Sequence, residues 1–83
     1  MTSEAIYDKL TAIFRKNFAD ASIVLRPETT ESDIAGWDSF NNASLIAAIE
    51  KEFGVRFKTA ELQKLDNLGN YVALIGSKLQ NRA

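Results

Sequence analysis

The feature of this sequence that most restricts its fold is the spacing of its apolar residues, which recur at intervals of three and four in three separate segments. Such a period places the apolar side chains on one face of an α-helix. It predicts helices over residues 4–18, 39–53 and 68–79, each with one face turned toward a common core. The predicted inward faces are Ile6, Leu10, Ile13, Phe14 and Phe18; then Asn42, Leu45, Ile46, Ile49 and Phe53; then Leu68, Val72, Ile75 and Leu79.

The residues at the expected helix ends agree with this assignment. Small polar residues precede each helix, and such residues are the usual N-caps. Gly54 follows the second helix, in the position where a glycine commonly ends one. A brief fourth helix is expected through Leu62 and Leu65. The expected N-caps are, in chain order, Ser3, Asp38 or Ser39, Thr59 for the brief helix, and Asp66 or Asn67.

The first two main helices are joined by a long connection, residues 19–37, which has no helical period and contains the only proline of the chain, Pro27. Its apolar residues predict that it is anchored to the core: Ile23, Val24, Leu25 and Ile34. Two short apolar stretches, 22–25 and 55–57, are too isolated to build a sheet. We therefore predict a single all-α domain over 1–83: a four-helix bundle of three main helices and a short one, with a long loop between the first two.

The composition excludes several kinds of chemistry. The chain has no histidine and no cysteine, so it can build neither a Ser-His-Asp nor a Cys-His mechanism, nor a metal site with nitrogen or sulfur ligands. A core this small supplies only about 3–5 kcal/mol, which leaves little for a preorganised catalytic pocket. We expect a protein that is not an enzyme and holds no metal.

The charge balance argues against nucleic acid as a partner, because the formal net charge is −1 and the pI is about 5.3. Nucleic-acid binding typically needs a basic face. No apolar run approaches the roughly 20 residues of a membrane span, and the first residues lack the pattern of a secretory signal. We expect a soluble, cytoplasmic monomer.

One helix start is physically distinctive. Gly36-Trp37-Asp38-Ser39-Phe40 closes the loop and opens the second helix, so the Ser39 hydroxyl is expected near the positive pole of that helix. Backbone N–H groups at such a position can meet an anion such as a phosphodiester. Ordinary capping by Asp38 or Ser39 is the alternative.

A second apolar ridge flanks the inward face of this helix. Phe40, Ala43 and Ala47 follow at helical spacing, and they form either the rim of the core or a docking surface. The charged residues nearby are interpreted as solvated: Glu50, Lys51 and Glu52 on the helix, and Glu61 with Lys64 beyond it.

Two stretches together carry a resemblance. Asp38-Ser39-Phe40, followed at 45–55 by Leu-Ile-Ala-Ala-Ile-Glu-Lys-Glu-Phe-Gly-Val, resembles the acyl carrier protein family, whose hallmark is an Asp-Ser-Leu-type tripeptide at the start of its second helix. The tripeptide alone is a weak signal. With the Glu-Phe-Gly-Val ending at the correct spacing it is strong, and the likeness extends over essentially the whole chain.

The resemblance implies a carrier. In this family a phosphopantetheinyl transferase moves the 4′-phosphopantetheine arm of coenzyme A onto the serine, here Ser39. The arm ends in a thiol, so a chain without cysteine can carry acyl groups as thioesters. The further partners implied are a ligase that loads the acyl group, and acyltransferase or synthase enzymes that receive it.

The resemblance also implies roles for the neighbours of Ser39. Asp38 would position the transferase and its metal, Phe40 would contact partners, and Ala47 would occupy the exposed apolar position of the second helix. We add Ala43 from the flanking ridge and Arg56 from the charge pattern as expected partner contacts.

The surface charge departs from the family pattern. Typical fatty-acid carriers are strongly acidic along the second helix, whereas here Asn41, Asn42 and Ser44 occupy its first turns, and Arg56 and Lys58 follow it. Because surface charge selects partners, we expect a specialised lipid or secondary-metabolite pathway, such as polyketide synthesis, rather than general fatty acid biosynthesis.

Two alternatives stay open. One is an aminoacyl or peptidyl carrier loaded by an adenylating enzyme, although Trp37 departs from the Gly-Gly-X-Ser pattern common in such carriers. The other is an unmodified helical adaptor that binds a protein through Phe40, Ala43 and Ala47.

Overall fold

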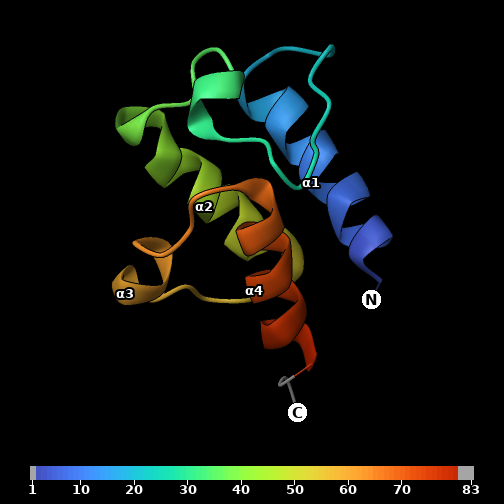
Figure 1. Cartoon of the computed structure of the whole chain (residues 1–83), viewed down its shortest axis with the longest axis vertical. Coiled ribbons are helices and arrows are strands. Elements are labelled where there is room, and N and C mark those ends of the chain that lie inside the picture. The colour runs from blue at the N-terminus through green and yellow to red at the C-terminus, as the bar shows by residue number, and fades with distance from the viewer. Residues whose placement is uncertain (1, 81–83) are drawn as a thin grey trace.

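The computed structural model describes residues 2–80, and of Ser39 and Phe40 it describes the backbone only. The helices are α1 (Ser3–Asn17), the 3₁₀ helix η1 (Glu31–Asp33), α2 (Ser39–Phe53), α3 (Thr59–Leu62) and α4 (Leu68–Gln80). No strand occurs within residues 2–80. Three long helices and one short one surround a single core, with the long loop and η1 across one end (Figure 1). The predicted all-α bundle is confirmed.

The core is built from the predicted faces of the three long helices. Ile13, Phe18 and Leu79 are only partly buried at its edge, and Asn42 is half-buried. The fully enclosed side chains include Leu10 and Phe14 of α1, Leu45 and Ile49 of α2, and Leu68 and Ile75 of α4. The loop contributes Ile23, Ile34 and Trp37 to the core, and the segment after α2 contributes Val55.

Three details at the helix ends differ from the prediction. The N-cap of α1 is Thr2, whose hydroxyl accepts the Ala5 N–H at 3.1 Å, and the predicted cap Ser3 is the first helical residue. The helix ends at Asn17, one residue early. Thr59 likewise opens α3 rather than capping it, because the Lys58 N–H is already held by the Glu61 carboxylate at 2.8 Å.

Other helix ends agree with the sequence. The side chain of Asn67, one of two predicted caps, accepts the Asn70 N–H at 3.0 Å. Gly54 ends α2 in the left-handed region, with φ 66° and ψ 36°, where a glycine has no steric penalty.

The long loop is anchored as predicted at Ile23 and Ile34, which are buried, and at Leu25, which is partly buried. The prediction was wrong for Val24, which is 63% exposed. Alternate side chains of an extended segment point to opposite sides, so when Ile23 and Leu25 face the core, Val24 faces solvent.

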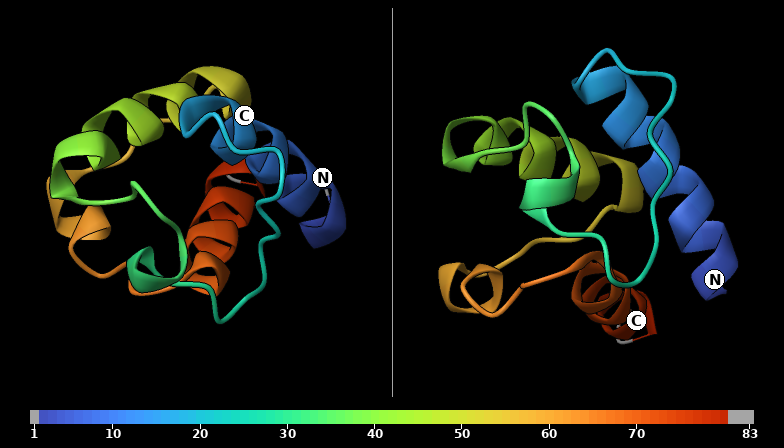
Figure 2. Two further views of the ribbon diagram at one scale, coloured as in Figure 1. Left: turned by 90° about the horizontal axis from the view of Figure 1, so that it is seen from above. Right: turned by 45° about the horizontal axis from the view of Figure 1, so that its top comes forward.

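The loop also caps α4 with its own backbone. The Leu68 N–H donates to the Thr29 carbonyl and the Gly69 N–H to the Pro27 carbonyl, both at 2.9 Å. A Cβ atom at position 69 would lie 3.2 Å from the Pro27 oxygen. A glycine in the first turn of α4 therefore permits the close approach of the loop, which Figure 2 shows passing beside the start of that helix.

Candidate functional site

Asp38 forms the start of α2. Its carboxylate accepts the Asn41 N–H at 2.9 Å, and its carbonyl accepts the Asn42 N–H at 2.9 Å. Asp38 is therefore the cap, one of the two predicted candidates. The backbone of Ser39 and Phe40 occupies the first two positions of the helix. The predictions about their side chains lie outside the described part of the chain.

A tight turn leads the loop into this helix start. Gly36 has φ 88°, in the left-handed region that favours glycine. Its carbonyl accepts a hydrogen bond from the Asn41 side-chain amide at 2.6 Å. The Trp37 N–H donates to the Ile34 carbonyl at 3.2 Å. The turn is thus fastened to the loop on one side and to the first turn of α2 on the other.

Trp37 anchors the turn in the core. Only 5% of its surface is exposed, and its indole N–H donates to the Asn42 side-chain oxygen at 3.0 Å. Its ring meets Phe14 of α1 edge-on, with centroids 5.1 Å apart and planes at 87°. It meets Tyr71 of α4 at 5.8 Å and 67°. We call Phe14, Trp37, Asn42 and Tyr71 the Trp37 cluster.

The two asparagines of α2 were not identified as positioning residues from the sequence. One signal was available: Asn42 is the only polar member of the inward face, and it follows the only tryptophan by five residues. A buried indole N–H needs an acceptor, and Asn42 supplies it.

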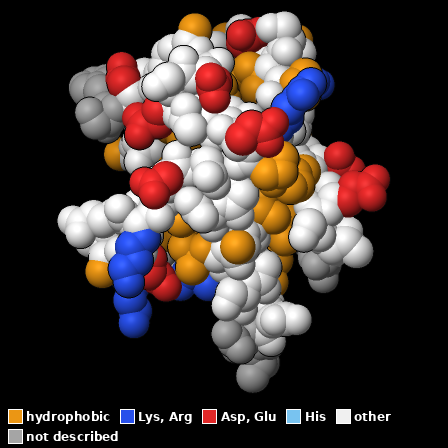
Figure 3. All heavy atoms as spheres, viewed as in Figure 1, with side chains coloured by type: hydrophobic (Ala, Val, Ile, Leu, Met, Phe, Trp, Pro, Cys, Tyr) orange, Lys and Arg blue, Asp and Glu red, His pale blue; other side chains and the backbone are white. Residues whose placement is uncertain are grey.

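The ionisation of Tyr71 in this cluster is affected by a charged residue of the loop. Burial, and secondarily the negative charge of Glu31 in η1, raise the pKa of Tyr71 to about 12. Acidic side chains are spread over the loop region in the upper part of the molecule (Figure 3). Residues 19–38 carry five carboxylates against one cation, Arg26, so the segment that leads into α2 is acidic.

The flanking ridge of α2 is not a rim of the core at the positions described. Ala43 and Ala47 are both exposed, as is Arg56 beyond the helix. The ridge leads to a shallow hollow of about 490 Å³, lined by Ala47, Glu50, Lys51, Gly54, Val55 and Arg56.

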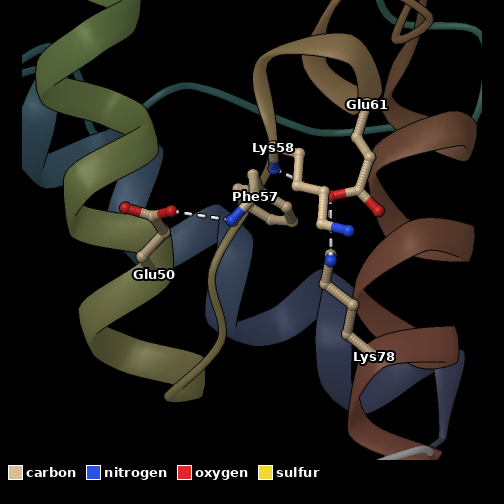
Figure 4. Close-up of polar contacts among 5 residues, drawn as sticks. All are labelled: Glu50, Phe57, Lys58, Glu61 and Lys78. Carbon is tan, nitrogen blue, oxygen red and sulfur yellow. Dashed lines mark hydrogen bonds and ion pairs between the residues drawn. The ribbon is translucent and has the colours of Figure 1, made fainter.

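A set of polar contacts around the Phe57 ring joins α3 to the rest of the bundle (Figure 4). Glu50 of α2 accepts the Phe57 N–H at 2.8 Å, and the Glu61 carboxylate pairs with Lys78 of α4 at 2.9 Å. The Lys78 ammonium lies 5.9 Å from the centroid of the Phe57 ring. We call Glu50, Phe57, Glu61 and Lys78 the α3 clasp.

The sequence did not predict the clasp, since Glu50 and Glu61 were interpreted as solvated charges. Hydrogen bonding by the Lys58 N–H, and then by Lys78, lowers the pKa of Glu61. Both members of the ion pair remain partly exposed, with 21% of the Lys78 and 30% of the Glu61 side chain accessible.

Comparison with known proteins agrees with the resemblance found in the sequence. A family model described as the phosphopantetheine attachment site matches residues 8–75. The acyl carrier protein of Thermotoga maritima is 30% identical over 92% of this chain and 94% of its own length. That of Cyanidium caldarium is 26% identical over 100% of this chain and 96% of its own length.

A solved structure agrees as well. The solution NMR structure of holo acyl carrier protein from Geobacter metallireducens superposes with a TM-score of 0.84 at 44% identity, covering 89% of this chain and 85% of that one. The fold and these matches define a small helical carrier domain with a phosphopantetheine prosthetic group, a class that carries groups and is not enzymatic. The chain belongs to the acyl carrier protein family.

The start of α2 fits such a group. A serine is the first residue of a helix of 15 residues, and the positive end of a helix favours a phosphodiester. When bound, the arm supplies a thiol that holds acyl groups as thioesters. Members of the family interact with phosphopantetheinyl transferases and with acyl-handling enzymes. Of the helices within residues 2–80, none is long and apolar enough to cross a bilayer.

Proposed function

We propose that this protein carries acyl groups as thioesters on a 4′-phosphopantetheine arm attached to Ser39, and presents them to partner enzymes. Residues 1–83 would form one carrier domain. The observation that carries the proposal is the position of Ser39 as the first residue of α2, directly after a cap that already satisfies the Asn41 N–H.

This division of roles between neighbours supports Ser39 as the modified residue. The Asp38 carboxylate does the capping, so the Ser39 hydroxyl is not required for it. A phosphodiester at that position would be stabilised by the helix dipole by about 0.3–1 kcal/mol. The backbone that holds it is fixed through Trp37 and Gly36, which contact the asparagines of the first turn.

We further propose that partners dock along the exposed side of α2. Ala43 and Ala47 are exposed and small, so a partner backbone can approach closely. Phe40 would contact the partner beside the arm, Asp38 would help to position the transferase, and Arg56 would contribute at the far end. The transferase, a loading ligase and an acyltransferase or synthase are the proposed partners.

The pathway is proposed to be a specialised one in lipid or secondary metabolism. Support comes from the charge of α2, which has no acidic residue in its first turn and whose far end carries Lys51 beside Glu52, followed by the exposed Arg56. A cytoplasmic location remains a prediction from the sequence.

The test is the intact mass of the protein after incubation with coenzyme A, magnesium and a broad-specificity phosphopantetheinyl transferase. We expect the wild type to gain the mass of one phosphopantetheine and Ser39→Ala to gain none. Because Asp38 caps the helix, Ser39→Ala should have a melting temperature close to that of the wild type. Its loss in free energy of unfolding should be smaller than the roughly 0.5–2 kcal/mol that a lost cap costs.

Ser44→Ala is the matched control, since Ser44 is an exposed serine of the same helix. It should gain mass like the wild type. A gain that persists in Ser39→Ala would place the arm elsewhere, and no gain in the wild type with several transferases would refute the carrier role of this serine.

A further inference from the structure

The charge on the exposed side of α2 changes along the helix. Its first end carries the Asp38 carboxylate, with Glu31 and Asp33 exposed on η1 in the preceding loop. Its middle presents uncharged residues, Ala43, Ser44 and Ala47. Its last turn carries Lys51 beside the exposed Glu52, and Arg56 follows in the segment after the helix, so this end has cations that the first end lacks.

The two cations lie around one hollow. Lys51 and Arg56 both line the space of about 490 Å³ whose other walls are Ala47, Glu50, Gly54 and Val55. Glu50, the one carboxylate in this lining, is held by the Phe57 N–H at 2.8 Å. This bond fixes the position of the carboxylate but not its charge, so the lining carries two positive charges and one negative charge.

Neither cation forms an ion pair with another described residue. Within residues 2–80 the ion pair found is that of Lys78 with Glu61, and no carboxylate lies within ion-pair distance of Lys51 or Arg56. Both side chains are exposed. An exposed hollow with small walls and two unpaired cations is complementary to a protruding carboxylate.

We infer that this hollow receives an acidic side chain of the partner enzyme while the arm on Ser39 enters that enzyme's active site. The inference rests on the proposed function, because the arm fixes which side of α2 faces the partner. Lys51 follows Ser39 by three turns, so at 1.5 Å per residue the partner's acidic group would lie about 18 Å from the entrance for the arm.

The test measures amide shifts of the isotope-labelled full chain by NMR during titration with two synthetic helical peptides. Both peptides carry the same leucine face, flanked in one by glutamates and in the other by lysines. We expect the glutamate peptide to shift the amides of Ala47, Lys51 and 54–56, and the lysine peptide to leave them unchanged.

Charge reversal then locates the effect. The double variant Lys51→Glu/Arg56→Glu should bind the glutamate peptide about tenfold more weakly. This is the change expected when two exposed charge contacts are lost and replaced by repulsion. Lys9→Glu/Lys64→Glu changes the net charge equally with two exposed lysines that do not line the hollow, and should bind nearly as the wild type does.

Three results would overturn the inference: shifts of equal size with both peptides, shifts confined to another surface or absent, or an equal loss in the two double variants. None of these depends on modification of Ser39. The mass measurement on the same sample reports separately whether the carrier proposal holds.

Discussion

The Trp37 cluster and the α3 clasp each connect α2 to α4, but by opposite means. The cluster is a buried contact of three rings with a single internal hydrogen bond from Trp37 to Asn42. The clasp is a set of polar contacts at the surface, in which Lys78 and Glu61 remain partly open to water. Water can replace the second kind of contact and cannot replace the first.

These contacts show that the start of α2 is held more firmly than α3. The start of α2, where Ser39 lies, is attached to the best-buried part of the molecule. No residue of α3 is buried. Leu62 packs against the core while only partly buried, and the polar contacts of this short helix are individually weak when exposed. The structure thus combines a firmly held start of α2 with a lightly held α3.

Trp37→Ala should show the largest effect, because it empties the centre of the cluster. Truncation of a buried aromatic costs about 3–5 kcal/mol, which matches the about 3–5 kcal/mol that a core of this size supplies. We expect no cooperative thermal transition by circular dichroism.

Trp37→Phe is the matched variant, since it keeps a ring and loses the N–H that binds Asn42. It should retain a cooperative transition at a lower temperature. A wild-type melting temperature in Trp37→Ala would mean that the cluster does not hold the start of α2.

The second prediction concerns alkaline pH and the cluster. The pKa of Tyr71 is raised from 10.0 to about 12, so the folded state holds this proton more tightly than the unfolded chain. The resulting stability is fully present below pH 10 and is lost as the pH rises toward 12.

Urea denaturation at a series of alkaline pH values measures the effect. Tyr71→Phe keeps the ring without the ionisable hydroxyl and should lose much less stability over the same range. An identical decline in the variant would assign the alkaline sensitivity to other groups.

The smallest effect is expected at the α3 clasp, at acidic pH. Because the pKa of Glu61 is lowered from 4.5, its contribution is present above that value and is lost as the pH falls through the folded-state pKa. Hydrogen exchange at the Lys58 amide, which donates to Glu61, should accelerate relative to the core amides as the medium is acidified.

Glu61→Gln should remove most of this acid response, whereas Glu52→Gln, at an exposed position of α2, should leave it in place. If acid instead loosened the core and α3 together, the two regions would not differ in the way that their contacts indicate.

The helices of this fold could be predicted from the sequence because their signal is local. The inward faces of α1, α2 and α4 follow from spacing, and the start of α2 follows from Asp38 and Ser39. The errors at Ser3 and Val24 also have local causes, since a neighbouring residue of similar type takes the cap or the buried position. At Thr59 the cap is Lys58, whose N–H binds the Glu61 carboxylate.

The missed contacts join residues that no spacing rule connects. The pairing of Glu61 with Lys78 requires α3 to lie against α4, and the role of Gly69 requires Pro27 to approach it. Asn42 is intermediate, because a polar residue on an inward face can be recognised in the sequence while its partner cannot.

The capping of α4 by loop carbonyls has a consequence for how the chain folds. Pro27 and Thr29 belong to the first half of the chain, and the helix start that they complete belongs to the second. Closing so long a stretch of chain costs entropy before the contact forms. The first turn of α4 therefore gains these hydrogen bonds only when both halves of the polypeptide have come together. Cleavage of the loop would therefore destabilise the start of α4 first.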